Sequence, residues 1–85
     1  MLKILRTVDG TVVVFLLSGR IEAEHLADLR ALIDAEADTV ALDLKEVTLV
    51  SRDTIRFLAG CEADGVEARN CPAYIRQWIE TEIRR

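Results

Sequence analysis

The sequence feature that most constrains the fold is a helix-like segment between two short apolar runs. The runs, residues 11–17 (TVVVFLL) and 39–44 (TVALDL), are rich in β-forming residues, which is typical of buried strands. Between them, residues 21–38 place apolar side chains such as Leu29 and Ile33 at steps of three and four, the spacing of one helix face. A strand–helix–strand unit of this length predicts two parallel strands joined by a right-handed crossover.

An antiparallel hairpin is predicted before this unit. Residues 2–8 (LKILRTV) form another apolar run, and Asp9-Gly10 separates it from the run that follows. Asp-Gly between apolar runs favours a two-residue turn of type I′. The first strand would lie at a sheet edge, where Lys3 and Arg6 are charges that discourage open-ended pairing. A homodimer through this edge is compatible with the sequence.

The second half of the chain continues the alternation. Residues 45–50 are predicted to be a connector with the apolar anchors Val47, Leu49 and Val50. Ser51 is suited to cap a helix that runs to about Asp64. Residues 66–70 (VEARN) follow as a short strand, and Pro72 fits the first turn of a third helix. The predicted order is β-β-α-β-α-β-α, which gives a small mixed four-stranded sheet with packed helices, an α/β fold.

Length and charge limit the classes of function. The chain has 85 residues, which predicts one domain over residues 1–85. Its net charge of −4 and pI of about 4.9 argue against a nucleic-acid partner, because phosphate binding requires a positive surface. The longest apolar run, residues 12–17, is too short to span a bilayer, and the first residues lack the pattern of a signal peptide. We therefore expect a cytoplasmic protein without direct membrane insertion.

The sequence contains no recognisable catalytic or cofactor-binding pattern. Its four glycines are scattered and assemble neither a P-loop nor a dinucleotide fingerprint. His25 lies in an acidic segment, which favours a solvated side chain over a catalytic base. Cys61 and Cys71 are expected to be small apolar fillers, with a disulfide or metal pair as the alternative. Asp43 is expected to bond the backbone of a neighbouring loop. A non-enzymatic protein without cofactor or metal is predicted.

The strand-to-helix turn is the strongest candidate site. A helix start offers free N–H groups and partial positive charge, and Arg52 and Arg56 share a helix face, so an anion or acidic partner could dock there. Asp53 weakens a pure anion site, because it already complements the dipole and is placed to pair with either arginine. The alternative is a helix capped by Ser51 with a solvated basic face.

The order of elements and several short motifs resemble the STAS domain, a family named for sulfate transporters and anti-sigma-factor antagonists. The matching pieces cover nearly the whole chain: VVVFLLSGRI, LADLRALI, VALDLKEVTLV and SRDTIRFLAG. The resemblance implies a STAS-like fold. It also implies that a partner kinase or phosphatase reads the turn before the second helix.

This turn departs from the family pattern. Phosphorylated members read Asp-Ser-Ser/Thr-Gly, and the first serine accepts the phosphate. Here Ser51 stands at the aspartate position, Arg52 at the phosphoacceptor, Asp53 at the second serine and Thr54 at the glycine. The resemblance therefore implies that the usual switch is lost, because Arg52 fixes positive charge where phosphate would add about −1.5 to −2. Ser51 and Thr54 remain alternative phosphoacceptors, although the Ser51 hydroxyl is suited to capping.

We therefore expect a protein-interaction module that binds an anti-sigma factor or kinase-like regulator. Its contact residues would be those of the turn: Ser51, Arg52, Asp53, Thr54 and Arg56. The alternative is an accessory subunit of a transport or regulatory complex. In that case Tyr74 and Trp78 would form a docking stripe on the third helix, unless both simply cover the edge of the core. A nucleotide or anion binder is the third possibility.

Overall fold

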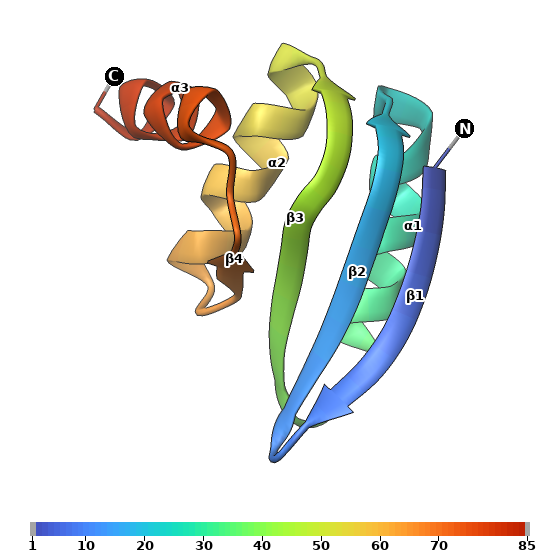
Figure 1. Ribbon diagram of the computed structural model, residues 1–85. Helices are drawn as coiled ribbons and strands as arrows, with labels where there is room; N and C mark the ends of the chain where they lie inside the picture. Colours follow the sequence, from blue (N-terminus) through green and yellow to red (C-terminus); the bar gives the residue numbers. More distant parts are fainter. Residues whose placement is uncertain (1, 85) are drawn as a thin grey trace.

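The computed structural model describes residues 2–84, which form a four-stranded mixed sheet and three helices (Figure 1). In chain order the elements are β1 (Leu2–Asp9), β2 (Val12–Ile21), α1 (Ala23–Asp34), β3 (Thr39–Val50), α2 (Arg52–Ala63), β4 (Glu67–Arg69) and α3 (Ala73–Ile83). The predicted order and the α/β class are confirmed. None of these helices combines the length and the apolar character needed to cross a bilayer.

The strands lie in the spatial order β1-β2-β3-β4. β1 pairs antiparallel with β2, whereas β2 with β3 and β3 with β4 are parallel. α1 connects the first parallel pair and lies behind β1 and β2 in Figure 1. The strand–helix–strand unit is therefore confirmed, and the ends of β2 and β3 that lead into α1 and α2 meet at one edge of the domain.

The hairpin turn differs from the predicted one by one residue. Asp9 remains in β1 and pairs with Val12, so the loop consists of Gly10 and Thr11. Of these two, only Gly10 has a positive φ, 64°. This is the arrangement of a type II′ turn, in which glycine occupies the first central position, and not the predicted type I′. The shift keeps the Asp9 carboxylate on the sheet, where Arg69 binds it at 3.1 Å.

Both parallel strands are longer than predicted. Residues 45–50, expected as a connector, continue β3, because Val47 pairs with Gly19 and Val50 with Ile21. β2 correspondingly extends through Ser18 to Ile21, with register irregularities in this stretch. The local pattern of residues 45–50 did not reveal a strand because the irregular pairing breaks the simple alternation of buried and exposed residues.

α1 is shorter than the predicted segment 21–38. It begins after Glu22, whose side chain accepts from the N3 backbone, while the Nδ1 atom of His25 accepts a hydrogen bond of 3.0 Å from the Glu22 N–H. This reciprocal capping arrangement marks the helix start. His25 is therefore a half-buried capping residue, and the prediction of a solvated histidine is wrong.

One hydrophobic core fills the space between the sheet and the helices. Alternate residues of β2 and β3 face this side and meet buried residues from all three helices: Val13, Phe15, Leu17, Val40, Leu42, Leu44, Leu29, Ile33, Ile55, Leu58, Ile75 and Ile79. Cys61 belongs to the same cluster and Cys71 packs against it, and both thiols are free, which confirms that they act as fillers. Burial raises the pKa of the Cys61 thiol to about 11.

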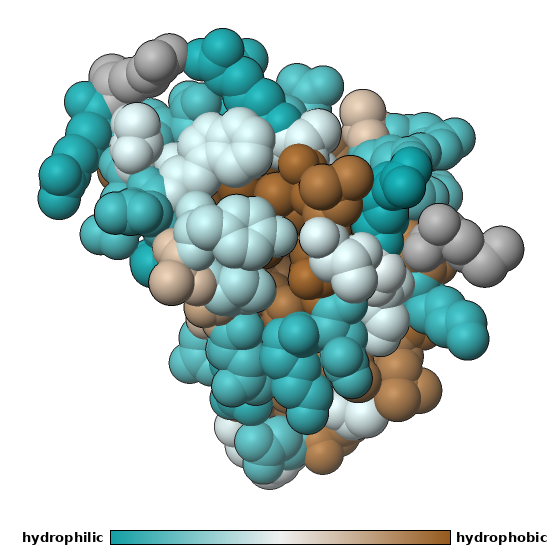
Figure 2. All heavy atoms as spheres, turned by 45° about the horizontal axis from the view of Figure 1, so that its top comes forward, coloured by the Kyte–Doolittle hydropathy of each residue, from teal (hydrophilic) through white to brown (hydrophobic). Residues whose placement is uncertain are grey.

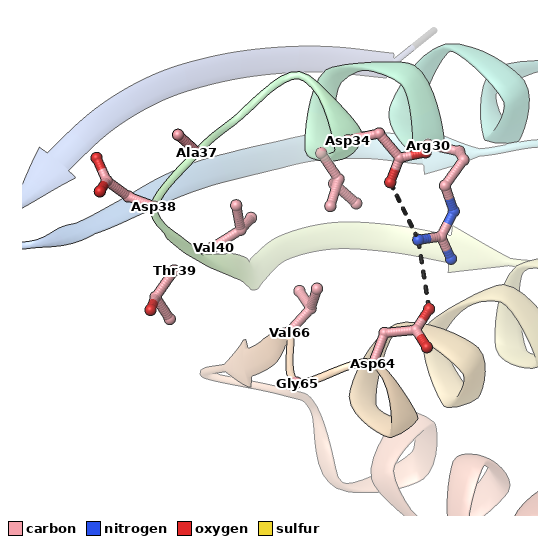
Figure 3. Close-up of a pocket in the computed structure, with 10 residues that line it drawn as sticks. Arg30, Asp34, Ala37, Asp38, Thr39, Val40, Asp64, Gly65 and Val66 are labelled. Carbon is pink, nitrogen blue, oxygen red and sulfur yellow. Dashed lines mark ion pairs between the residues drawn. The ribbon is translucent and has the colours of Figure 1, made fainter.

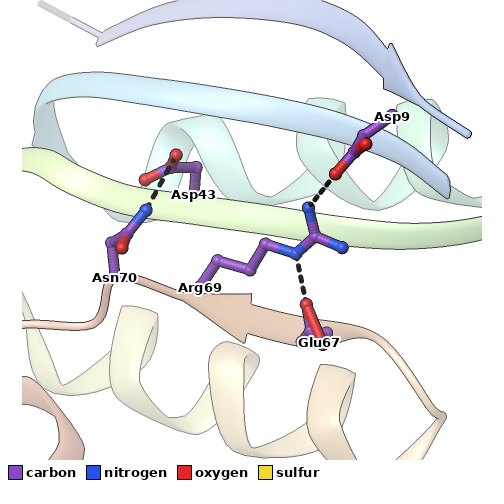
Figure 4. Close-up of polar contacts among 5 residues, drawn as sticks. All are labelled: Asp9, Asp43, Glu67, Arg69 and Asn70. Carbon is purple, nitrogen blue, oxygen red and sulfur yellow. Dashed lines mark hydrogen bonds and ion pairs between the residues drawn. The ribbon is translucent and has the colours of Figure 1, made fainter.

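The opposite face of the sheet carries a polar cluster (Figure 4). Arg69 on β4 binds Glu67 and reaches Asp9 at the end of β1, so it bridges the two outer strands. Asn70 donates to Asp43 at 3.1 Å, and the other oxygen of Asp43 accepts from the Lys45 backbone N–H at 3.1 Å. Asp43 therefore has a structural role, but the predicted bond to the backbone of a neighbouring loop is wrong: its backbone donor, Lys45, lies in the same strand, and its contact with the loop after β4 is to the Asn70 side chain.

Candidate functional site

The turn between β3 and α2 is held by a chain of hydroxyl groups. Ser51 has extended backbone angles, and its Oγ accepts a hydrogen bond of 3.3 Å from the Thr54 N–H, so the predicted cap is confirmed. Thr54 Oγ1 donates to the Ile21 carbonyl at 3.2 Å and lies 3.2 Å from Ser51 Oγ. Because Thr54 has one hydroxyl proton, Ser51 donates to Thr54, which donates to Ile21. This chain ties the start of α2 to the end of β2.

The predicted site residues separate into a surface group and a buried one. Ser51, Arg52, Asp53 and Arg56 are exposed, whereas Thr54 is fully buried. Thr54 therefore supports the turn from below and cannot contact a partner in this conformation. A kinase could reach Ser51 but not Thr54, and the Ser51 hydroxyl already both accepts and donates a hydrogen bond.

Arg52 and Arg56 do share a helix face, but this face meets Glu82 near the end of α3. Arg52 Nε donates to Glu82 Oε1 at 3.0 Å, and Arg56 Nε lies 3.9 Å from Oε2. The Glu82 side chain is 10% exposed, while Arg52 and Arg56 remain 49% and 59% exposed. The two arginines are therefore anchored internally and still accessible, which differs from a purely solvated basic face. Among residues 2–84, Asp53 forms no ion pair with either arginine.

Arg52 and Glu82 each stand at a helix end where the helix dipole disfavours their charge. The two charges compensate each other only when folding brings these helix ends together. Arg52 is the first residue of α2, where the helix dipole is positive, and Glu82 lies in the last turn of α3, where it is negative. Sequence reasoning missed this contact. The sequence did contain a signal, namely the sign of the two charges. A charged side chain at the helix end that disfavours it often has a partner from another element.

The other end of the same helix pair repeats the pattern. Glu62, in the last turn of α2, accepts two hydrogen bonds from Arg76, in the first turns of α3, at 2.9 and 2.8 Å. The two ion pairs thus join the start of α2 to the end of α3 and the end of α2 to the start of α3. They therefore link α2 and α3 at both ends of the helix pair.

A hollow of about 270 Å³ adjoins the turn. It is lined by Arg20, Ile21, Glu22, Ala23, Leu49, Val50 and Ser51. The hollow lies at the carboxyl ends of the parallel strands β2 and β3, where ligand sites commonly form in α/β folds. Leu49, predicted to be a connector anchor, is 53% exposed here, whereas Val47 is buried as predicted. With the top of Figure 1 tilted toward the viewer, the visible face has a central hydrophobic area bordered by hydrophilic side chains (Figure 2).

A second hollow, of about 490 Å³, lies between the ends of α1 and α2 (Figure 3). Arg30 lines it, 3.7 Å from Asp34 and 3.6 Å from Asp64, and its guanidinium lies 5.2 Å from the centre of the Phe57 ring. These partners already bind Arg30, which therefore joins the ends of the two helices. Within residues 2–84, His, Cys, Asp and Glu side chains form no group of three or more suited to a metal ion.

The two aromatic residues of α3 have different environments. Tyr74 is 52% exposed, whereas Trp78 is half-buried and packs against the core. With Gln77 and Thr81 they line a shallow open hollow on the outer side of the helix. The predicted docking stripe is therefore present only in part, since Trp78 covers the core edge and Tyr74 does not.

No protein-family model matches this sequence, and no curated protein matches it significantly. The STAS resemblance therefore stays a prediction.

Proposed function

We propose that this protein is a non-enzymatic, cytoplasmic interaction module that resembles the STAS-domain antagonists of anti-sigma factors. Its binding surface comprises Leu49, Ser51, Arg52, Asp53 and Arg56, called here the turn surface. The observation that carries the proposal is the exposed Leu49 beside an apolar-lined hollow, together with the accessible arginines that follow the same turn in the sequence. An apolar centre with arginine nearby is the usual composition of a protein-binding hot spot.

The geometry of the turn supports a surface with a fixed state. The Ser51 hydroxyl is engaged in the cap, Thr54 is buried, and Arg52 occupies the position of the family phosphoacceptor. Arg52 is in turn held by Glu82. The proposed module therefore binds its partner, an anti-sigma factor or kinase-like regulator, without a serine phosphorylation switch.

A second candidate function is an accessory subunit of a transport or regulatory complex. The exposed Tyr74 and the shallow hollow on α3 favour it, because a half-exposed aromatic side chain is a common docking residue. The two candidates use different surfaces and can be separated by variants at Leu49 and Tyr74.

The test is affinity capture from the source cells with four forms of the protein: wild type, Leu49→Asp, Tyr74→Ala and the control Leu32→Asp. Leu32 is 40% exposed on α1, so the control adds the same charge away from the turn. We expect the wild type to recover a regulator. Its recovery should fall at least about tenfold with Leu49→Asp, as for a hot-spot residue, and should not fall with the other two variants. A loss confined to Tyr74→Ala would support the second candidate, and equal recovery by all forms would reject both surfaces. Intact-mass measurement of the native protein tests whether it carries phosphate.

A further inference from the structure

The outer strand β1 is a long edge with one free side. It pairs only with β2, in an uninterrupted register from Leu2–Gly19 to Asp9–Val12, whereas the other outer strand, β4, is three residues long. Leu5 and Val8 on β1 are 57% and 60% exposed. A long, regular and partly apolar edge strand is a template for pairing with another chain.

The structure removes one of the two charges that protect this edge in the sequence. Arg6 reaches the segment between α1 and β3 and donates two hydrogen bonds to Glu36, at 2.9 and 3.0 Å. Its charge is therefore compensated within the molecule. Lys3 remains as the one basic residue of the strand without an ion pair among residues 2–84. A single lysine is weak protection for a strand of eight residues.

The alternating hydrogen-bond pattern of antiparallel strands shows which backbone N–H and C=O groups of β1 are not bonded to β2. In a two-residue hairpin the last strand pair, here Asp9 and Val12, exchanges both of its hydrogen bonds. The alternate residues of β1 then direct their N–H and C=O groups away from β2: Leu2, Ile4, Arg6 and Val8. These groups are positioned to form a ladder with a second antiparallel strand.

We propose that β1 pairs antiparallel with β1 of a second copy of this chain, about a two-fold axis at Leu5. In this register Leu5 faces Leu5 of the second copy, and the exposed Val8 faces Leu2. Lys3 faces Thr7 and is diagonal to Asp9 of the second copy. The Asp9 carboxylate is bound by Arg69 of its own chain but is 73% exposed, so it stays within reach of the long Lys3 side chain. The contact is isologous and closes as a dimer.

Neighbouring registers are less favourable. An axis at Arg6 would place two arginines directly opposite, and like charges in a cross-strand pair are destabilising. An axis at Thr7 would place the apolar Leu5 opposite Asp9. Of these three registers, the axis at Leu5 is the one that places apolar side chains opposite one another and opposes no like charges.

The dimer goes beyond the proposed function and does not depend on it. The turn surface lies at the end of β3, two strands away from β1, so pairing leaves it accessible. A dimer would carry two such surfaces, and a multivalent partner could bind it more tightly than a monomer without any new contact.

Sedimentation velocity over a concentration series tests the association. We compare wild type with Leu5→Lys and with Leu49→Lys, a control at an equally exposed apolar residue, 53% against 57%. The wild type should dimerise, Leu5→Lys should weaken the dimer by at least about tenfold because it opposes two like charges, and Leu49→Lys should not. A wild type that is monomeric at millimolar concentration overturns the proposal. So does a dimer that Leu5→Lys leaves intact. Circular dichroism checks that both variants fold.

Disulfide trapping tests the register. In a Cys71→Ser background, Leu5→Cys should form a cross-linked dimer on mild oxidation, because facing residues near a two-fold axis lie within disulfide reach. Thr7→Cys is the control: the two Thr7 positions would be separated by about 14 Å along the strands. The remaining Cys61 is buried and does not compete. Cross-linking through Thr7→Cys but not Leu5→Cys, or through neither, overturns the proposed register.

Discussion

Each end of the α2–α3 pair carries an ion pair between an arginine and a glutamate, but the two pairs differ in geometry. At the end of α2, Glu62 and Arg76 form two short hydrogen bonds and are 26% and 35% exposed. At the start of α2, Arg52 makes one hydrogen bond to Glu82 through Nε and is 49% exposed. The first ion pair uses the full fork of its arginine, whereas the second leaves most guanidinium N–H groups of Arg52 free.

This difference suggests a division of roles along one helix. A bidentate, half-buried pair is suited to holding two helices in place, because both partners have little freedom left. A single bond from an exposed arginine contributes little to stability and leaves donors available to a partner. The start of α2 would be a poor anchor by itself, but the hydroxyl chain beneath it fixes the turn. Stability and recognition are thus assigned to different side chains within a few residues of each other.

The largest effect on stability is expected from Thr54→Val. The substitution keeps the shape of the side chain but leaves the Ile21 carbonyl without its donor, in a place where Thr54 is fully buried. We expect a loss of about 1–3 kcal/mol in the free energy of unfolding, the cost of a buried unsatisfied group. Urea denaturation measures it. The exposed Thr48→Val is the control, and equal stability of the two variants would show that the hydroxyl chain does not hold the turn.

The next effect concerns binding and compares the two arginines directly. Arg52→Ala should weaken the partner's affinity by about 2 kcal/mol, as for a hot-spot arginine, whereas Arg76→Ala should leave it unchanged. Calorimetry with the purified partner measures both. A similar loss of affinity in the two variants would mean that the position of α3, and not the Arg52 side chain, controls binding.

Much of this arrangement follows from local sequence, and some of it does not. Ser51 was predicted as the cap because its hydroxyl acts within one helical turn, and the strand–helix–strand unit follows from periodicity. The burial of Thr54 and the Arg52–Glu82 contact were not predicted, because each joins residues about thirty positions apart, 33 and 30 in the two cases. Contacts of this kind are set by how the elements pack, which a single-sequence pattern does not encode.

Leu49 illustrates the same limit from the opposite direction. Its pattern, apolar and two residues beyond the buried Val47, predicted an anchor, but in the folded β3 its side chain is 53% exposed. In the hairpin, a shift of the turn by one residue is enough to change the strand register. Asp9-Gly10 and Gly10-Thr11 are both plausible turns, and the choice moves the pairing of the whole of β1.

A smaller effect is expected from the pair at the end of α2. A double-mutant cycle with Glu62→Ala and Arg76→Ala should give a coupling free energy of about 0.5–1 kcal/mol, toward the upper range for partly exposed ion pairs with good geometry. Thermal and urea unfolding of the four proteins measure it. A coupling near zero would show that side-chain packing, and not this ion pair, fixes α3 on α2.

The smallest effect is expected from the matching cycle at the start of α2, with Arg52→Ala and Glu82→Ala. Because Arg52 makes one exposed hydrogen bond and the Arg56–Glu82 separation is 3.9 Å, the coupling between Arg52 and Glu82 should be below about 0.5 kcal/mol. Arg56 also remains to compensate Glu82 when Arg52 is removed, which lowers the penalty of the single variant further. The comparison uses the difference between the coupling free energies of the two cycles, measured under the same salt and urea conditions. A coupling at Arg52–Glu82 equal to that at Glu62–Arg76 would contradict the division of roles, because an arginine held that firmly would have to break a stabilising contact before it could reorient toward a partner.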